Sequence, residues 1–171
     1  FRDTSAETIA PYQGKLAQGL KSDTTQPLPT DNRIVIPSIS LDEPIKQGSS
    51  IALIQDGGTW HRPKTVTPNE AGNSVIVGHR YYGNNVSTFY HLDKVIVDEV
   101  FAVYWEGEEI FYQVTDKAIV PATAVEIEAQ TDERKLTLYT CHPLWSATER
   151  LVITAKPIDA SITKGAQSEE S

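Results

Sequence analysis

The stretch Lys135-Leu-Thr-Leu-Tyr-Thr-Cys141 ends in the only cysteine of this 171-residue chain and has the alternation of a β-strand. In a pleated strand, Leu136 and Leu138 fall on one face, whereas Tyr139 and Cys141 fall on the other. The thiol therefore points away from the leucine side, and we expect it at a surface cleft. The alternative is an inert, buried cysteine.

A second apolar run, Arg150-Leu-Val-Ile-Thr-Ala155, follows after only eight residues. A connection this short predicts neighbouring strands, with Cys141 and Arg150 flanking one opening. His79 ends another apolar run, Val75-Ile-Val-Gly-His79. A lone thiol with a histidine and an arginine in reach is a candidate for nucleophilic acyl transfer.

These segments resemble a known family. Thr137-Leu-Tyr-Thr-Cys141 is similar to the Thr-Leu-x-Thr-Cys signature of sortases, the cell-surface transpeptidases. Arg150 opens a final strand as the family's arginine does, and Val75 to His79 is similar to the strand that ends in the sortase histidine. The resemblance covers roughly residues 32 to 157, and it implies His79, Cys141 and Arg150 as catalytic residues.

Composition narrows the class of protein. The length fits one domain that can bury a core without disulfides. Hydrophobic content of 39% and charged content of 22% are typical of soluble globular proteins. The net charge of −8, without a dense Lys and Arg run, disfavours nucleic acid and anionic bilayers as partners. No apolar run approaches the roughly 18 to 20 residues that span a membrane.

We expect three segments along the chain. Residues 1–31 form an N-terminal extension and linker, in which Thr4-Ser-Ala-Glu7 fits a capping box of a short helix. Residues 32–158 form the catalytic barrel, and residues 159–171 form a polar tail. The chain starts at Phe1 and contains no methionine, which predicts a fragment or processed form from which an N-terminal signal or anchor helix has been cut. The sortase resemblance implies an ectodomain that follows an N-terminal membrane anchor. The resemblance implies a position on the extracytoplasmic face of the membrane.

The pattern predicts an all-β fold. Short runs rich in β-branched and aromatic residues predict strands at 33–36, 38–45, 73–78, 97–105, 110–115, 117–120, 135–141 and 150–156. Gly107 marks a hairpin turn within 105–109, and short helical turns are predicted at 50–54 and 88–95. Periodicity leaves a sandwich or a closed barrel open. The sortase resemblance implies a closed eight-stranded β-barrel with short helices.

The resemblance also implies a mechanism. Cys141 attacks a peptide carbonyl within a Leu-Pro-x-Thr-Gly-like sorting signal, His79 protonates the departing amine, and Arg150 donates hydrogen bonds to the carbonyl or its oxyanion. The resulting thioester is transferred to an amine, such as a cell-wall precursor or a pilin lysine. This reaction attaches proteins to the cell surface.

Several side chains near the cysteine have two interpretations. His142 is a rival base, but adjacent strand residues face opposite ways, so we favour His79. Arg150 could instead pair with Glu149 or Glu133 on the surface. Candidate substrate-binding residues are Thr140, Trp145 and His142. Trp60 and His61 are expected to be packing and loop residues.

No cofactor is predicted. Carboxylates cluster where some sortases bind calcium, and they suit a hard cation. A solvated acidic face is the favoured interpretation of this cluster, which comprises Glu126, Glu128, Asp132 and Glu133. Ala10-Pro-Tyr12 lacks the acid of the lid found in pilin-polymerising sortases, and no long helical insertion precedes the cysteine strand as in the haem-anchoring subgroup. We therefore expect a housekeeping-type enzyme, similar to class A, D or E.

Other functions compete with this prediction. A cysteine peptidase could hydrolyse the same bond. A papain-type protease places its cysteine before its histidine, the reverse of the order here. A zinc hydrolase normally needs three protein ligands, which here would be Cys141 and two histidines. The four histidines contain no close His-x-x-x-His pair, and they are His61, His79, His91 and His142. A non-catalytic β-barrel binding module is the remaining alternative.

Overall fold

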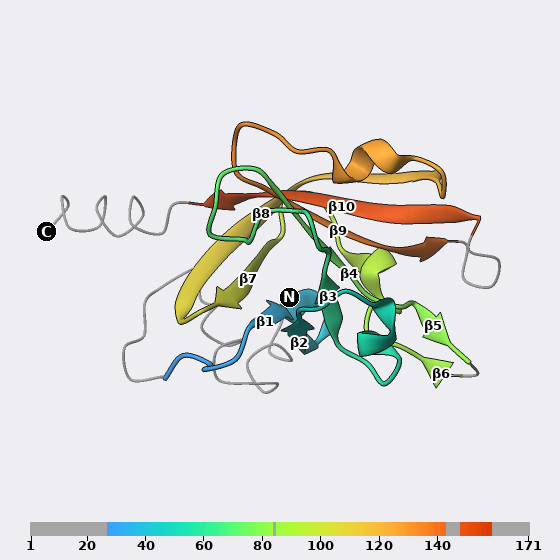
Figure 1. Cartoon of the computed structure of the whole chain (residues 1–171), viewed down its shortest axis with the longest axis horizontal. Coiled ribbons are helices and arrows are strands. Elements are labelled where there is room, and N and C mark those ends of the chain that lie inside the picture. Colours follow the sequence, from blue (N-terminus) through green and yellow to red (C-terminus); the bar gives the residue numbers. More distant parts are fainter. Residues whose placement is uncertain (1–26, 84, 143–147, 159–171) are drawn as a thin grey trace, which may run out of the picture.

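The computed structural model describes residues 27–83, 85–142 and 148–158, and eight of its strands close into one barrel (Figure 1). Around the barrel the order is β1-β2-β3-β4-β9-β10-β8-β7, and β7 pairs with β1 to complete the circle. These strands are β1 Arg33–Ile36, β2 Leu41–Lys46, β3 Thr59–His61, β4 Asn73–Val77, β7 Val100–Trp105, β8 Glu108–Pro121, β9 Lys135–His142 and β10 Glu149–Ile158. The predicted all-β class and closed eight-stranded barrel are confirmed.

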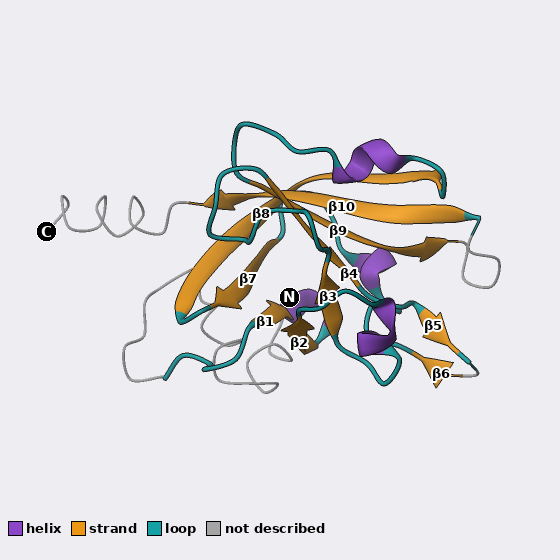
Figure 2. Ribbon diagram, viewed as in Figure 1, coloured by secondary structure: helices purple, strands orange, loops and turns teal. Residues whose placement is uncertain are grey.

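The described helices are all short (Figure 2). They are the 3-10 helices η1 Pro37–Ile39, η2 Ile51–Ile54, η3 Leu92–Lys94 and η4 Val125–Glu128. A separate two-stranded sheet is formed by β5 Tyr81–Tyr82 and β6 Asn85–Val86. Within the described ranges, no helix has the length and apolar character needed to cross a membrane. The predicted N-terminal helix, residues 10–12, Trp145 and the tail 159–171 lie outside the described residues.

The barrel interior is filled by one face of each strand. Leu136 and Leu138 of β9 are fully buried in the main hydrophobic cluster. Phe101 and Tyr112 stack across β7 and β8 with their ring centroids 5.7 Å apart. The Tyr112 hydroxyl donates to the Pro68 carbonyl over 3.0 Å, and burial raises the pKa of Tyr112 to about 12. The core thus anchors the inward face of β9, which leaves its outward face for the thiol.

One predicted boundary is wrong in the middle of β8. The runs predicted at 110–115 and 117–120 form a single strand, because Thr115 is an extra residue in the ladder with β10. Asp116 pairs with Thr154 while Val114 pairs with Ala155, which is a β-bulge. The polar side chain of Thr115 therefore marks a bend and not the end of a strand.

Two strands begin later than predicted. Pro37 opens η1, and Ser40 ends it with φ of 55°, so β2 begins only at Leu41. Asp98 also has a positive φ, 79°, and β7 begins at Val100. The hairpin turn at Gly107 is present where it was predicted, since both central residues of the β7–β8 loop have positive φ. Three short strands were not predicted, namely β3, β5 and β6.

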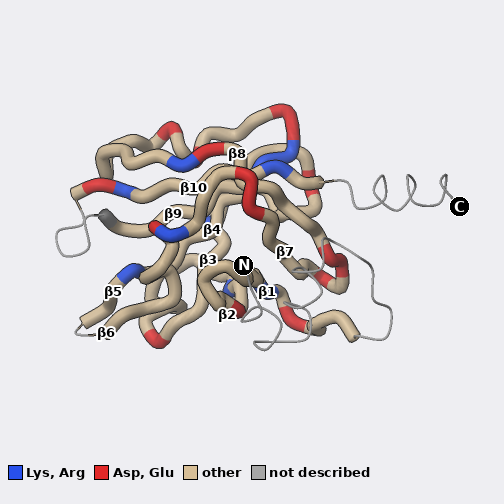
Figure 3. Tube along the Cα trace, turned by 180° about the vertical axis from the view of Figure 1, so that it is seen from behind, with Lys and Arg blue, Asp and Glu red and all other residues tan. Residues whose placement is uncertain are grey.

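Charged positions are dispersed over the chain. Figure 3 shows Asp and Glu spread along strands and loops with Lys and Arg between them. The net charge of −8 is therefore a property of the whole chain and not of a single acidic segment. No continuous basic stripe runs along the described trace in this view.

Candidate active site

Cys141 and Arg150 lie side by side at one end of the barrel. They are cross-strand partners in the antiparallel pair of β9 and β10. The Arg150 Nη1 atom lies 4.0 Å from the Cys141 Sγ atom, and the same nitrogen donates to the Glu149 carbonyl over 3.1 Å. The short connection thus joins neighbouring strands, as predicted. A guanidinium is held beside the sulfur by the pairing of the backbone.

His79 reaches the same place through a parallel pair. Strand β4 runs parallel to β9, with Val77 opposite Tyr139. Continuing this register by two residues brings His79 level with Cys141. The His79 carbonyl accepts a hydrogen bond from the Phe89 amide over 2.9 Å, which fixes the chain just beyond the strand.

Gly78 makes this close approach possible. It is buried between β4 and His79, and a Cβ atom at this position would lie 2.8 Å from Cδ2 of Phe89. Phe89 is fully buried, so its ring has little room to move away. The Thr140 hydroxyl donates to the Gly78 carbonyl over 2.8 Å, and this buried hydrogen bond ties β9 to β4 one residue before each functional side chain.

The three predicted residues line one pocket of about 180 Å³. Cys141 is partly exposed, on the face of β9 opposite the core leucines. Thr140 also lines the pocket, and its hydroxyl is already committed to Gly78. The apolar walls of the pocket are Ile51, Ile54, Trp60 and Val77. A thiol, an imidazole and a guanidinium therefore face one hollow.

Burial shifts the pKa of His79 downward. Partial removal from water lowers the pKa of His79 below its ordinary value, because the charged imidazolium loses hydration. Its ring lies 5.0 Å from the ring of Tyr82, measured between centroids. Within the described part of the chain, the imidazole makes no hydrogen bond. At neutral pH the ring is therefore predominantly the neutral form, which can accept a proton.

Arg80 was missed in the sequence, although it directly follows His79. Only 7% of the residue is exposed, and its guanidinium makes contacts in three directions. Nη1 donates to the Cys141 carbonyl over 3.3 Å, Nε donates to the Tyr90 carbonyl over 3.1 Å, and Nη2 lies 3.4 Å from Oδ1 of Asp93. Arg80 thus joins the chain after His79 to the residue that carries the thiol.

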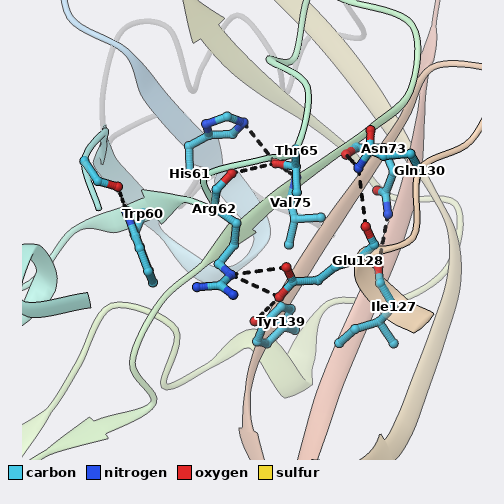
Figure 4. Close-up of polar contacts among 11 residues, drawn as sticks. Trp60, His61, Arg62, Thr65, Asn73, Val75, Ile127, Glu128, Gln130 and Tyr139 are labelled. Carbon is cyan, nitrogen blue, oxygen red and sulfur yellow. Dashed lines mark hydrogen bonds and ion pairs between the residues drawn. The ribbon is translucent and has the colours of Figure 1, made fainter. Parts of the chain in front are cut away.

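A second cluster adjoins the pocket (Figure 4). Nε of Arg62 lies 3.2 and 3.0 Å from the two carboxylate oxygens of Glu128, and the Tyr139 hydroxyl donates to Glu128 over 2.6 Å. Burial, together with this bond to the carboxylate, raises the pKa of Tyr139 and keeps the phenol protonated. The Arg62 guanidinium also lies 4.9 Å from the ring centroid of Trp60.

Arg62, Tyr139 and Arg150 are shared between the cysteine pocket and a neighbouring hollow of about 200 Å³. The second hollow lies toward η4, and its remaining walls are Ala122, Ala124, Val125, Ile127 and Glu128. The two hollows adjoin each other through these three shared residues, and their other walls are largely small or apolar. Adjoining hollows with apolar walls and a few polar groups suit a peptide ligand.

The remaining candidates have different positions. His61 is buried, with Nε2 2.7 Å from the Val66 carbonyl and its ring 5.5 Å from that of Trp105, so it is the packing residue that was predicted. Trp145 lies outside the described residues. His142 closes β9, and its side chain is also outside the described part.

Across the described ranges, no group of three or more His, Cys, Asp or Glu side chains gathers closely enough to hold a metal ion. In the acidic cluster, Glu128 is bound to Arg62 and Tyr139. A calcium site at this cluster would have to break that network.

Comparison with known proteins agrees with the barrel fold. A model of the sortase domain family matches residues 34–158. Among solved structures, Streptococcus agalactiae sortase C1 in complex with MTSET has a TM-score of 0.67 and 30% identity, covering 74% of this chain and 66% of that chain. Sortase C-1 from Actinomyces oris has a TM-score of 0.68 and 28% identity, covering 74% of this chain and 71% of that chain.

A third similar structure is a lid mutant of sortase A from Corynebacterium diphtheriae, with a TM-score of 0.69 and 23% identity. It covers 92% of this chain and 84% of that chain, and at this identity it supports the fold alone. The aligned part spans just under two thirds of the sortase C1 chain. Among curated proteins, no sequence matches this chain significantly.

The chain belongs to the sortase family, whose members are cysteine transpeptidases of the extracytoplasmic face. The similar structures include both sortase A and sortase C, so these matches do not assign the chain to one subclass.

Proposed function

We propose that this protein is a transpeptidase that cleaves a Leu-Pro-x-Thr-Gly-like sorting signal and joins the acyl fragment to an amine at the cell surface. The observation that carries the proposal is the pairing of Cys141 with Arg150 in one pocket with His79. In the first half-reaction, a bond forms between Cys141 Sγ and the substrate carbonyl carbon. The peptide C–N bond breaks, and the product is a thioester.

His79 carries the proton in both halves. Its lowered pKa leaves it neutral at pH 7, so it accepts the thiol proton during attack and passes it to the departing amine. In the second half-reaction, an incoming neutral amine attacks the thioester and gives a proton to His79. The cysteine sulfur leaves as a thiolate and takes that proton back from His79, which restores the thiol and the neutral imidazole. A new peptide bond results, and atoms and charge balance without a cofactor.

Arg150 stabilises the charge that develops on the substrate oxygen. Its guanidinium stands beside the sulfur, so a carbonyl attacked by that sulfur comes within reach of planar N–H donors. The adjoining hollows toward η4 accept the chain that precedes the scissile bond. Ala122, Ala124, Val125 and Ile127 offer apolar contacts to leucine and proline side chains of a sorting signal.

Substitution of the thiol tests the proposal. Cys141→Ala should abolish both cleavage and amine transfer, with an unchanged melting temperature, because the sulfur lies outside the main core. The assay uses a Leu-Pro-x-Thr-Gly peptide, an amine and separation of the products. Retained turnover in this variant would contradict a covalent mechanism.

A matched pair of histidine variants assigns the proton carrier. His79→Ala should reduce turnover by about 10²- to 10⁴-fold, the usual contribution of a positioned acid or base. His142→Ala should have a smaller effect. If His142→Ala were the more damaging change, the assignment of His79 would be wrong.

Hydrolysis of the same bond is the second candidate function. The cysteine pocket is partly open, so water can reach a thioester when no amine is bound. Turnover measured with and without amine separates the two. A rate and a product mixture that do not respond to amine would identify a peptidase.

A further inference from the structure

A larger hollow lies next to the cysteine pocket, and the two are linked by the contact between Tyr82, which lines the larger hollow, and His79, which lines the pocket. The larger hollow has a volume of about 830 Å³, within the range of about 300 to 1,000 Å³ typical of ligand sites. Its lining residues come from the end of η1 and the start of β2, from the turn at residues 55–57, from the β5–β6 hairpin and from the segment that follows β6. We call this hollow the hairpin groove.

The hairpin groove and the cysteine pocket share a wall. Tyr82 lines the groove, His79 lines the pocket, and their ring centroids are 5.0 Å apart. Tyr82 is 42% exposed, so its ring forms an open edge between the two hollows. A molecule in the groove can therefore extend one end past Tyr82 to the imidazole.

The charge of the groove is negative. Glu43 and Asp56 line it, and no lysine or arginine is among its lining residues. Glu43 falls on the same row of β2 as the core residues Leu41 and Ile45, but it is only half-buried. Burial raises the pKa of Glu43, so this carboxylate is poorly hydrated and gains from a cationic partner.

Nearby cations are already held elsewhere. The Lys46 ammonium donates to the Leu53 and Gly57 carbonyls, each over 3.0 Å. Arg33 forms ion pairs with Asp31 at 2.7 Å and with Asp42 at 2.8 Å. Both cations interact with Glu43 at longer range, but neither lines the groove.

We propose that the hairpin groove binds the acceptor of the transfer reaction, a peptide-like chain that bears an ammonium group. The inference rests on the proposed function, because only a thioester enzyme needs an amine at this position. The carboxylates of Glu43 and Asp56 concentrate the protonated amine, and Tyr82 provides a surface for its chain. Its reactive end passes Tyr82, loses the first proton of its ammonium group to water, and attacks the thioester as a neutral amine. The second proton goes to His79, which returns it to the departing cysteine sulfur.

A charge reversal at the rim tests the proposal in the whole chain. Asp56 is exposed, so Asp56→Lys should fold normally. The acceptor is lysine amide, and transfer is followed at a fixed concentration of a Leu-Pro-x-Thr-Gly peptide. We expect the KM for lysine amide to rise about ten-fold, since an attraction becomes a repulsion, and the difference to shrink in 0.5 M NaCl.

Three controls accompany that variant. Asp116→Lys changes net charge equally at an exposed position outside the groove and should leave every KM unchanged. Hydroxylamine is small and largely uncharged, so its transfer rate should be the same in Asp56→Lys and wild type. Glu43→Gln, which keeps the shape of the side chain, should raise the KM for lysine amide several-fold.

The outcomes separate this inference from the proposed function. If the thioester forms and hydroxylamine is transferred, but lysine amide has the same KM in all variants, the groove is not the acceptor site and the transpeptidase remains. If no thioester forms with any sorting peptide, the proposed function fails first. If the groove instead binds a second copy of this chain, Asp56→Lys would change the sedimentation coefficient and not the KM, and this result would also overturn the inference.

Discussion

At the scale of single residues, Arg150 presents a planar fork of donors, and that shape distinguishes it from a lysine of equal charge. Its Nη1 atom lies 4.0 Å from the Cys141 sulfur and also donates to the Glu149 carbonyl. Both contacts use this one nitrogen, so a lysine could keep them together with the charge, but it could not present a second, coplanar N–H donor to the substrate oxygen. The chemistry we propose depends on the fork.

We therefore expect Arg150→Lys to lower turnover by about 10²- to 10³-fold, the usual cost of losing an oxyanion donor. The melting temperature should stay within a few degrees of wild type. Steady-state transpeptidation and thermal unfolding are measured side by side. Near-native turnover would show that Arg150 acts only as a surface cation.

The lowered pKa of His79 predicts that the stability of the fold depends on pH. Burial lowers its pKa in the folded state, so between the folded value and the ordinary value of about 6.5 the unfolded chain binds more protons. The free energy of unfolding should then rise with pH across this interval and fall as the pH drops below about 6.5. The contribution is fully present only above the ordinary pKa.

Denaturant titrations of wild type and His79→Gln at pH 7.5 and 5.5 measure this contribution. The wild type should lose more stability than the variant on acidification, since glutamine does not titrate. An equal loss in both proteins would show that His79 is not desolvated in the folded state.

At the scale of the elements, the site depends on the ends of β4 and β9 staying together. Thr140 bonds to the Gly78 carbonyl, and Arg80 bonds to the Cys141 carbonyl while it also holds Tyr90 and Asp93. The strand ends are thus connected by polar side chains and by backbone pairing. These bonds keep the imidazole and the thiol at one level.

Arg80→Lys is the direct test of this connection. Lysine can keep the contact with Asp93 but cannot hold two carbonyls at once, so we expect a loss of about 1–3 kcal/mol in the free energy of unfolding. Chemical denaturation followed by tryptophan fluorescence measures it. Lys94→Met, an exposed cation on the neighbouring η3, is the matched control and should change stability by less than about 0.5 kcal/mol.

The network of Arg62, Glu128 and Tyr139 fixes η4 against the barrel. Tyr139→Phe removes the 2.6 Å hydrogen bond and leaves the Arg62–Glu128 pair. We expect a loss of about 1.5–3 kcal/mol, as for a hydrogen bond to a charged group, and a higher KM for the sorting peptide. A variant that keeps both values would show that η4 does not form part of the peptide site.

The sequence predicted most of the barrel and the three residues of the proposed site. Alternation in β9 placed Leu136 and Leu138 inside and Cys141 outside, because period-two patterns survive folding. The sequence did not predict the parallel pairing of β4 with β9, because the register between strands that are distant in the chain is set by the whole barrel. The sequence wrongly predicted a break in β8 near Thr115, because a polar residue can mark either a β-bulge or the end of a strand.

Arg80 and Tyr139 could not be assigned roles for a similar reason. Their partners, Asp93 and Glu128, lie 13 positions after Arg80 and 11 positions before Tyr139 and are brought near by loops. Tyr139 shares the outward face of β9 with Cys141, which is the one signal that the pattern offered. The acidic cluster suggested calcium, whereas the structure uses Glu128 to bind an arginine and a phenol.

At the scale of the whole molecule, His79 lines the cysteine pocket and also contacts Tyr82, which lines the hairpin groove. The cysteine pocket continues toward η4, and the hairpin groove opens beyond Tyr82. A transfer reaction needs two partners to reach one reactive carbon in turn. In our proposal, the acyl donor stays in the cysteine pocket while the amine approaches from the hairpin groove.

The formation of a thioester on Cys141 is the central claim, and intact-protein mass spectrometry tests it most directly. The full chain is mixed with a Leu-Pro-x-Thr-Gly peptide without amine, the reaction is quenched in acid, and the mass of the intact protein is measured. We predict a mass increase equal to the peptide truncated after threonine, located on Cys141, lost on addition of hydroxylamine and absent from Cys141→Ala. Peptide cleavage with no adduct at any quench time, or an adduct that persists in Cys141→Ala, would contradict the account.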